Sequence, residues 1–234
     1  MNTDELKFKF LENGSSEAAG YEISAGSKKL NNVKVFEQDI NGISFSAMAE
    51  VELQSQILTL FQIITEIPSQ NIKDGFVIEA GFSLFTLFGT DKAYRIKVQD
   101  YTKNPFSDTT DDLTVALRIQ SEQLYLLRKY GIAGESVRFD EKILTVKGAL
   151  SEKMIFMQRS GDCKKGDSGW CIRSAEDTDE HDEPSEYEAI YAFQLLKLRP
   201  AIIKVLPLPY EYIAVFDGEY IEAILNENDE NLIQ

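Results

Sequence analysis

The chain has 234 residues, of which 39 are Asp or Glu and 24 are Lys or Arg, so its formal net charge is −15, and 43% of its residues are hydrophobic. This composition is typical of a globular protein with an acidic surface and argues against disorder along the whole chain. The acidic balance also argues against binding to nucleic acid or to a membrane, because anionic phosphates are neutralised by clustered Lys and Arg.

The compartment is indicated by what the chain lacks. Residues 1–10 alternate charged and apolar side chains and contain no continuous apolar stretch of the kind found in signal peptides. No run of about 18 uncharged apolar residues, the length that spans a membrane, occurs in the sequence. Cys163 and Cys171 have no companion pair, which indicates neither a disulfide framework nor a zinc ribbon. We therefore expect a reduced, cytoplasmic protein that needs no metal and no other cofactor.

The first half of the chain begins with a turn-rich stretch, residues 13–32, and then shows clear periodicities. Alternating apolar residues on both sides of Asn41-Gly42 predict a β-hairpin with a type I′ turn. Apolar residues three and four positions apart then predict a helix within 50–68, ended by Pro68. Two further strands are predicted at 75–88 and 94–98, separated by the turn at residues 89–91.

The second half begins with a helix predicted over about 111–130, which is preceded by capping residues and ends at Gly131. Further elements follow in chain order. They are a short strand at 143–147, a buried strand at 154–157, a helix around 186–198, a hairpin of 212–216 and 220–225 around Asp217-Gly218, and a polar tail at 226–234 that is expected to fray.

These elements predict an α+β fold with mainly antiparallel sheets and a few packed helices. The most plausible seam lies near Gly148, which divides the chain into an N-terminal unit, 1–148, and a C-terminal unit, 149–234. The pattern leaves open whether the two units share one sheet.

The candidates for catalysis are few. His181 is the only histidine, and it lies in the most acidic stretch of the chain, whereas nucleophilic catalysis needs a base that a third group holds rigidly. Cys163 and Cys171 are best interpreted as half-buried structural residues. We therefore predict no catalytic residue and expect that the protein is not an enzyme.

The acidic stretch, residues 176–188, holds eight acids and no Lys or Arg. Asp177, Asp179 and Glu188 match positions one, three and twelve of a calcium-binding loop, but Asp182 occupies position six, where that loop requires glycine. A solvated loop is the first interpretation, because charge runs usually stay hydrated. An acidic surface that attracts a basic partner is the second, and calcium binding is the third.

One ordered set of motifs is more specific. A strand ending in Gln158-Arg159 is followed by a turn and by Asp167-Ser168-Gly169-Trp170, which contains the only tryptophan. The acidic stretch, Arg199-Pro200, a Leu-Pro segment at 206–209 and an aromatic hairpin come next. Over about residues 150–225 this order resembles the bacterial immunity-protein family known as immunity protein thirty-three, formerly a domain of unknown function.

The resemblance implies a small α+β domain without known catalytic activity, which is assigned to toxin neutralisation. We therefore predict a protein that binds and neutralises a cognate bacterial toxin domain, which we expect to be basic; the alternative is a small-ligand or peptide-binding module. The motif around Trp170 is interpreted first as structural and second as a partner contact. The candidate partner-binding residues are Asp167, Trp170, Asp177, Asp179, Glu180, Asp182 and Glu183.

Overall fold

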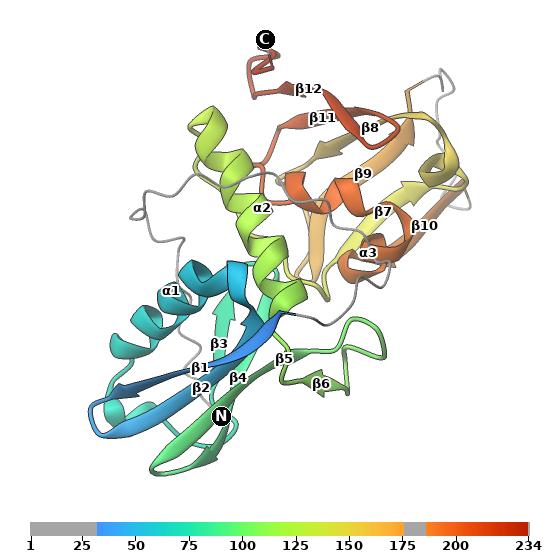
Figure 1. Cartoon of the computed structure of the whole chain (residues 1–234). Coiled ribbons are helices and arrows are strands. Elements are labelled where there is room, and N and C mark those ends of the chain that lie inside the picture. Colours follow the sequence, from blue (N-terminus) through green and yellow to red (C-terminus); the bar gives the residue numbers. More distant parts are fainter. Residues whose placement is uncertain (1–31, 176–185, 234) are drawn as a thin grey trace. The chain divides into compact units, whose positions relative to one another are not determined.

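The computed structural model describes residues 32–175 and 186–233. Contacts divide the described chain into two units, one formed by residues 32–121 and the other by the rest. The division falls inside helix α2, Thr114–Tyr130, whereas the sequence suggested a seam near Gly148, which lies within the second unit. Each unit has its own six-stranded sheet, so the two units do not share one (Figure 1). The predicted α+β class is confirmed.

The first unit is a mixed sheet with strand order β1-β2-β5-β4-β3, with β6 added to β5. Only the pairing of β2 with β5 is parallel. The elements are β1 Val33–Ile40, β2 Ile43–Glu50, α1 Gln54–Thr65, β3 Val77–Ala80, β4 Ser83–Thr90, β5 Ala93–Gln99, β6 Thr109–Thr110, and the 3₁₀ helices Val51–Leu53 and Ser69–Asn71. Helix α1 lies across one face of this sheet (Figure 1).

The core of the first unit lies between α1 and that face. The predicted hairpin is confirmed, because Asn41 and Gly42 have φ values of 55° and 79°, as a type I′ turn requires. The predicted apolar stripe of α1 is also confirmed. The six predicted residues are all buried, with Leu53 and Ile67 just outside the ends of α1, and they pack with alternate sheet residues such as Phe45, Leu87 and Ile96. The six are Leu53, Ile57, Leu60, Phe61, Ile64 and Ile67.

The strand predicted over 75–88 is wrong in one respect, because it is two strands joined by a tight turn. Gly81 has a φ of 64°, in the left-handed region, and the chain reverses there between β3 and β4. The helix predicted before Gly131 is confirmed as α2. The Asp112 carboxylate accepts a hydrogen bond from the backbone N–H of Thr114 at 3.0 Å, and Gly131 has a φ of 64°.

The second unit is a mixed sheet with strand order β10-β7-β9-β8-β11-β12, and only β7 and β9 run parallel. Its elements are β7 Lys142–Val146, β8 Met154–Arg159, β9 Asp167–Ser174, β10 Tyr187–Tyr191, α3 Leu195–Leu198, β11 Ile213–Asp217, β12 Tyr220–Leu225, and the 3₁₀ helices Ala149–Ser151, Ala192–Gln194 and Pro200–Val205. The core includes fully buried residues from and after α3, namely Leu195, Ile202, Ile203, Val205, Leu206 and Leu208.

Two predictions for the second unit are wrong. The helix predicted around 186–198 begins only at Ala192, because Tyr187–Tyr191 forms β10, which pairs antiparallel with β7. The aromatic and β-branched residues of this segment favour an edge strand over a helix. The tail after Leu225 does not fray at its start, because the backbone N–H of Leu232 donates to the carbonyl of Ile224 at 2.8 Å.

Candidate functional site

The charged side chain of Arg159, the last residue of β8, is only 2% exposed. Its guanidinium donates to backbone carbonyl oxygens, from Nε to Ser168 at 3.0 Å and from Nη1 to Glu135 at 2.8 Å and to Leu208 at 2.5 Å. Its Cζ also lies 4.5 Å from the centre of the Tyr210 ring. Burial lowers the pKa of Arg159, and Tyr210 partly opposes this effect. Arg159 thus joins three chain segments through their carbonyl groups.

The Ser-Gly-Trp motif, residues 168–170, makes similar hydrogen bonds to backbone groups. We call Arg159 and this motif together the framework. Ser168 Oγ donates to the carbonyl of Lys142 at 2.8 Å, and Trp170 Nε1 donates to the carbonyl of Leu206 at 2.9 Å. Gly169 has a φ of 82°, and a Cβ at this position would lie 2.3 Å from the carbonyl oxygen of Ser160. Ser168, Gly169 and Trp170 therefore each have a structural role, because they hold β9 to the neighbouring segments.

These observations correct one predicted contact. Trp170 is 2% exposed, so its side chain belongs to the core and is not offered to a partner. Asp167 is half-buried at the start of β9, opposite Lys142 of β7, and it remains a candidate. The other predicted partner-binding residues, Asp177, Asp179, Glu180, Asp182 and Glu183, lie outside the described residues, as does His181.

A second buried arginine was missed in the sequence. Arg199 is 4% exposed, and it donates to the carbonyl oxygens of Glu152 at 2.6 Å, of Lys153 at 2.9 Å and of Gly218 at 2.7 Å. Burial lowers its pKa. Arg199 therefore joins the turn before β8 to the turn between β11 and β12. The pair Arg199-Pro200 was visible in the sequence, but nothing in it showed that the guanidinium is buried.

The framework leaves the opposite face of the second sheet exposed. Residues that lie opposite each other on neighbouring strands project to the same side, so the register defines this face. On β10 and β7 this side also carries Tyr187 and Val146, and Val146 is buried. One row of more exposed residues is Ala189, Leu144, Cys171, Gln158, Ile213 and Leu225, and the next includes Arg173, Phe156, Val215 and Ala223. We call the ten residues named in these two rows the open face. Each is half-buried or exposed, and Leu144 is 49% exposed.

Arg173 is the only charged residue of the open face. Its Nη2 donates to the Tyr187 hydroxyl at 2.8 Å. A hydrogen bond with Cys171, more than the contact with Tyr187, raises the pKa of Arg173. Cys171 and Cys163 are both half-buried free cysteines, as predicted. A sheet face on which seven of ten residues are aliphatic or aromatic is suited to protein contact more than to chemistry.

The comparison with protein families selects the same unit. Residues 122–227 match the model of the Imm33-like domain family. The second unit is therefore similar to an Imm33-like domain. The match includes the predicted stretch of about 150–225, so the resemblance seen in the sequence is confirmed, and it begins at the residue where the second unit begins. No curated protein and no solved structure matches the chain.

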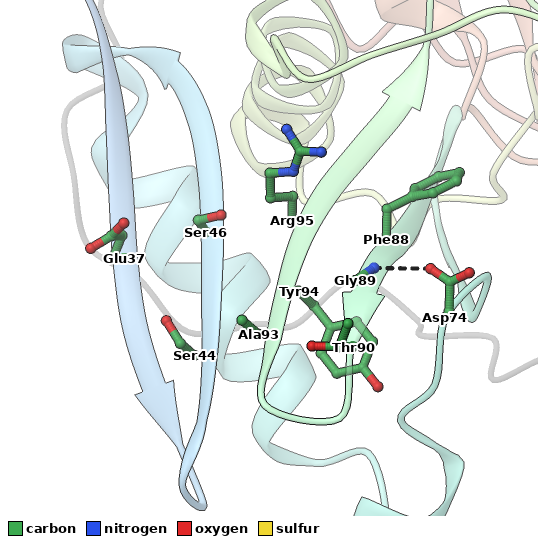
Figure 2. Close-up of a pocket in the computed structure, with 10 residues that line it drawn as sticks. All are labelled: Glu37, Ser44, Ser46, Asp74, Phe88, Gly89, Thr90, Ala93, Tyr94 and Arg95. Atoms are coloured by element: carbon green, nitrogen blue, oxygen red, sulfur yellow. Dashed lines mark hydrogen bonds between the residues drawn. The ribbon is translucent and has the colours of Figure 1, made fainter.

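A hollow of about 520 Å³ lies outside the second unit, on the sheet of the first unit. Figure 2 shows its lining, which comes from β1, β2, β4, β5 and the segment before β3. The backbone N–H of Gly89 donates to the Asp74 carboxylate at 2.9 Å at its margin. The exposed side chain of Arg95 and the ring of Phe88 come from neighbouring strands. The lining thus offers a small molecule one cation, Arg95, one partly exposed aromatic ring, Phe88, and two carboxylates, Glu37 and Asp74.

Two further features concern residues 32–175 and 186–233. No group of three or more His, Cys, Asp or Glu side chains is arranged there to hold a metal ion. No helix in these two ranges is long and apolar enough to cross a membrane.

Proposed function

We propose that this protein is an immunity protein that binds a cognate bacterial toxin domain in the cytoplasm and neutralises it without catalysing a reaction. The match of residues 122–227 to the Imm33-like domain family carries this proposal. The role of the motif residues supports a binding function. Arg159, Ser168 and Trp170 all use their polar atoms on backbone groups of the same unit, which leaves them no part in chemistry.

The proposed toxin domain is basic. The net charge of −15 favours a cationic partner, because opposite net charges accelerate diffusional encounter. A nuclease is one class of toxin that fits, since a protein that binds nucleic acid needs a basic surface. Asp167 and the five acidic candidates between Asp177 and Glu183 remain the predicted contributors to this attraction.

The test is co-expression with the toxin domain encoded by the neighbouring reading frame. We expect the protein to restore growth of cells that produce this domain, and to form a stoichiometric complex with a catalytically inactivated form of it in size-exclusion chromatography. Failure of both growth rescue and complex formation would contradict the proposal. Rescue without a stable complex would point to a catalytic mode of protection instead.

A second candidate function, the binding of a small ligand or peptide, is favoured by the hollow on the first unit. Its test is a screen of anionic aromatic metabolites for an increase in the thermal midpoint of the full chain. A true ligand of the hollow should lose its effect in Arg95→Ser, because Arg95 is the exposed cation of the lining. Trp170 fluorescence does not serve as the reporter, since Trp170 is buried in the second unit.

A further inference from the structure

We infer that the open face is the docking surface of the second unit, and that its occupant is a basic protein with an apolar contact centre whose cationic side faces strand β12. This inference rests on the proposed function and adds where the partner binds and what its surface must contain. It starts from an apolar sheet face that folding alone does not account for.

The size of the open face is a first argument. Six strands about 4.8 Å apart span about 24 Å, and the two rows take up about four residues at about 3.3 Å each, or about 13 Å, so the face covers roughly 300 Å². A patch of this size is comparable to the largest apolar patch of a typical soluble monomer, which is often a functional surface. It is less than half of the roughly 800 Å² that each partner buries in a standard interface. The remaining contact area must come from the margins of the face.

The charge along the chain shows what one margin contains. Residues 205–234 include seven acids and no Lys or Arg, and residues 176–188 include eight acids and none. The remainder of the chain has 24 acids and 24 bases, so these two segments account for the whole net charge. The first of these segments was not singled out in the sequence, although its lack of basic residues was visible there.

The structure puts the described residues of both segments, 205–233 and 186–188, at edges of the second sheet. Residues 205–234 form β11 and β12, and β12 is the outermost strand on one side. The exposed acids on and after the β11–β12 turn are Glu219, Glu222, Glu227, Asp229 and Glu230, which we call the β12 margin. Residues 176–188 lead into β10, the outermost strand on the other side, where Glu188 is exposed.

The exposed basic residues of this unit lie elsewhere. Three of them, Lys142, Lys164 and Lys165, are at one end of the strands, at the start of β7 and in the turn between β8 and β9. Lys153 is the exception near the β12 margin, where it pairs with Asp217 at 2.9 Å. An apolar centre with acidic long edges complements a partner with an apolar centre and a cationic side. The same edges disfavour a second copy of this chain, because face-to-face pairing brings acidic margins together.

Leu144 and Leu198 provide a matched test of the apolar centre, because they are 49% and 51% exposed in the same unit and only Leu144 belongs to the open face. The probe is the inactivated toxin domain encoded by the neighbouring reading frame. We expect Leu144→Ser to weaken its binding at least tenfold and Leu198→Ser to leave the dissociation constant within twofold. Equal effects of the two substitutions would overturn the open face as the docking surface.

The same two positions report occupancy directly. Maleimide should label the thiols introduced by Leu144→Cys and by Leu198→Cys equally in the free protein, with the two native cysteines as the background. Of the two introduced thiols, addition of the toxin domain should protect only the one at position 144, together with the native Cys171 of the same face. Poor labelling at position 144 in the free protein would mean that a second copy or another part of the chain already occupies the face, and would overturn the proposal.

The charge requirement is tested by a triple substitution of the β12 margin, Glu219→Gln, Glu222→Gln and Glu227→Gln. Its control removes the same charge from exposed acids of the first unit through Glu37→Gln, Glu66→Gln and Asp91→Asn. We expect the β12 triple to slow association roughly tenfold at low salt and to flatten its salt dependence, with a smaller change in the control. Equal changes would overturn the cationic side of the inference.

These outcomes separate the inference from the proposed function. If the toxin domain binds the wild-type chain and no variant weakens it, the docking surface is wrong and the immunity function stands. If the toxin domain does not bind the wild-type chain at all, the proposed function fails.

Discussion

The two sheets have the same plan but differ in their open faces. Each has six strands and one parallel pairing, and each buries one face in its own core. On the first sheet, the open side has a row with Glu37, Ser46, Arg95 and Phe88, in which charges alternate with small and aromatic residues. On the second sheet, the ten residues of the open face include a single charge. The first unit shows that one buried face is enough for such a sheet, and this contrast supports the inference that the apolar open face of the second sheet binds a partner.

The largest expected effect on stability comes from replacing an arginine, and it should differ between the two units. Arg159→Met removes a buried cation and leaves buried carbonyl groups without donors, which should lower the free energy of unfolding of the second unit by about 3–5 kcal/mol. Arg118→Met in the first unit breaks only partly exposed ion pairs with Glu50 and Glu52, which should cost about 1 kcal/mol or less.

Urea unfolding measures both effects. Trp170 is the only tryptophan, so its fluorescence follows the second unit, and far-ultraviolet circular dichroism follows both units. If Arg159→Met lowers the free energy of unfolding by less than about 1 kcal/mol, water molecules must reach these carbonyl groups and replace the lost donors.

The next effect concerns two glycines near the same framework. Gly169→Ala places a Cβ 2.3 Å from a backbone oxygen at a φ of 82°, so it should destabilise the second unit by at least about 2 kcal/mol. Gly166→Ala has a φ of 92° with open space around the new Cβ, so only the backbone preference opposes it, by about 1 kcal/mol. Denaturation midpoints followed by Trp170 fluorescence measure the difference, and equal midpoints would show that the β8–β9 turn relaxes around the added methyl group.

Much of the fold could be predicted because its signals are local. The turn at Asn41-Gly42, the apolar stripe of α1 and the stop at Gly131 each depend on residues within one element. The failures depend on partners far away in the sequence. Tyr187–Tyr191 becomes a strand because β7 is available to pair with it, and no periodicity in five residues reveals that.

The candidate site was harder to predict for a similar reason. The run Met154-Ile155-Phe156-Met157 predicts a buried strand, and Ile155 and Met157 are indeed fully buried. Met154 and Phe156, however, lie on the other side and are only half-buried. An apolar run cannot distinguish a strand covered on both sides from one with an apolar surface, because the covering layer comes from elsewhere in the chain.

A smaller effect should give the two units opposite responses to pH. Hydrogen bonds from Thr102 lower the pKa of Asp100 in the first unit, so this carboxylate adds stability above its ordinary pKa of 3.8, and the gain is lost as the pH falls through its folded value. Burial raises the pKa of Glu141 in the second unit, so ionisation costs stability as the pH rises from 4.5 through its folded value.

At pH 7, Asp100→Asn should therefore destabilise the first unit by about 1 kcal/mol, and Glu141→Gln should slightly stabilise the second. Both differences should shrink toward pH 3. Urea titrations at pH 7 and at pH 3 measure them, and a Glu141→Gln variant that is less stable at pH 7 would show that its bond from the Arg138 backbone outweighs the burial of the charge.

The smallest expected effect bears most directly on the difference between the open faces. Leu144 of the second unit and Val35 of the first are 49% and 50% exposed, so replacing either with Ser should change the free energy of unfolding by no more than about 0.5 kcal/mol. Equal, small losses in urea unfolding would mean that neither open face supports its fold. A loss above about 2 kcal/mol for Leu144→Ser alone would instead mean that the apolar face is packed in the free protein. In that case its composition would be explained by stability, and the contrast between the two sheets would no longer point to a partner.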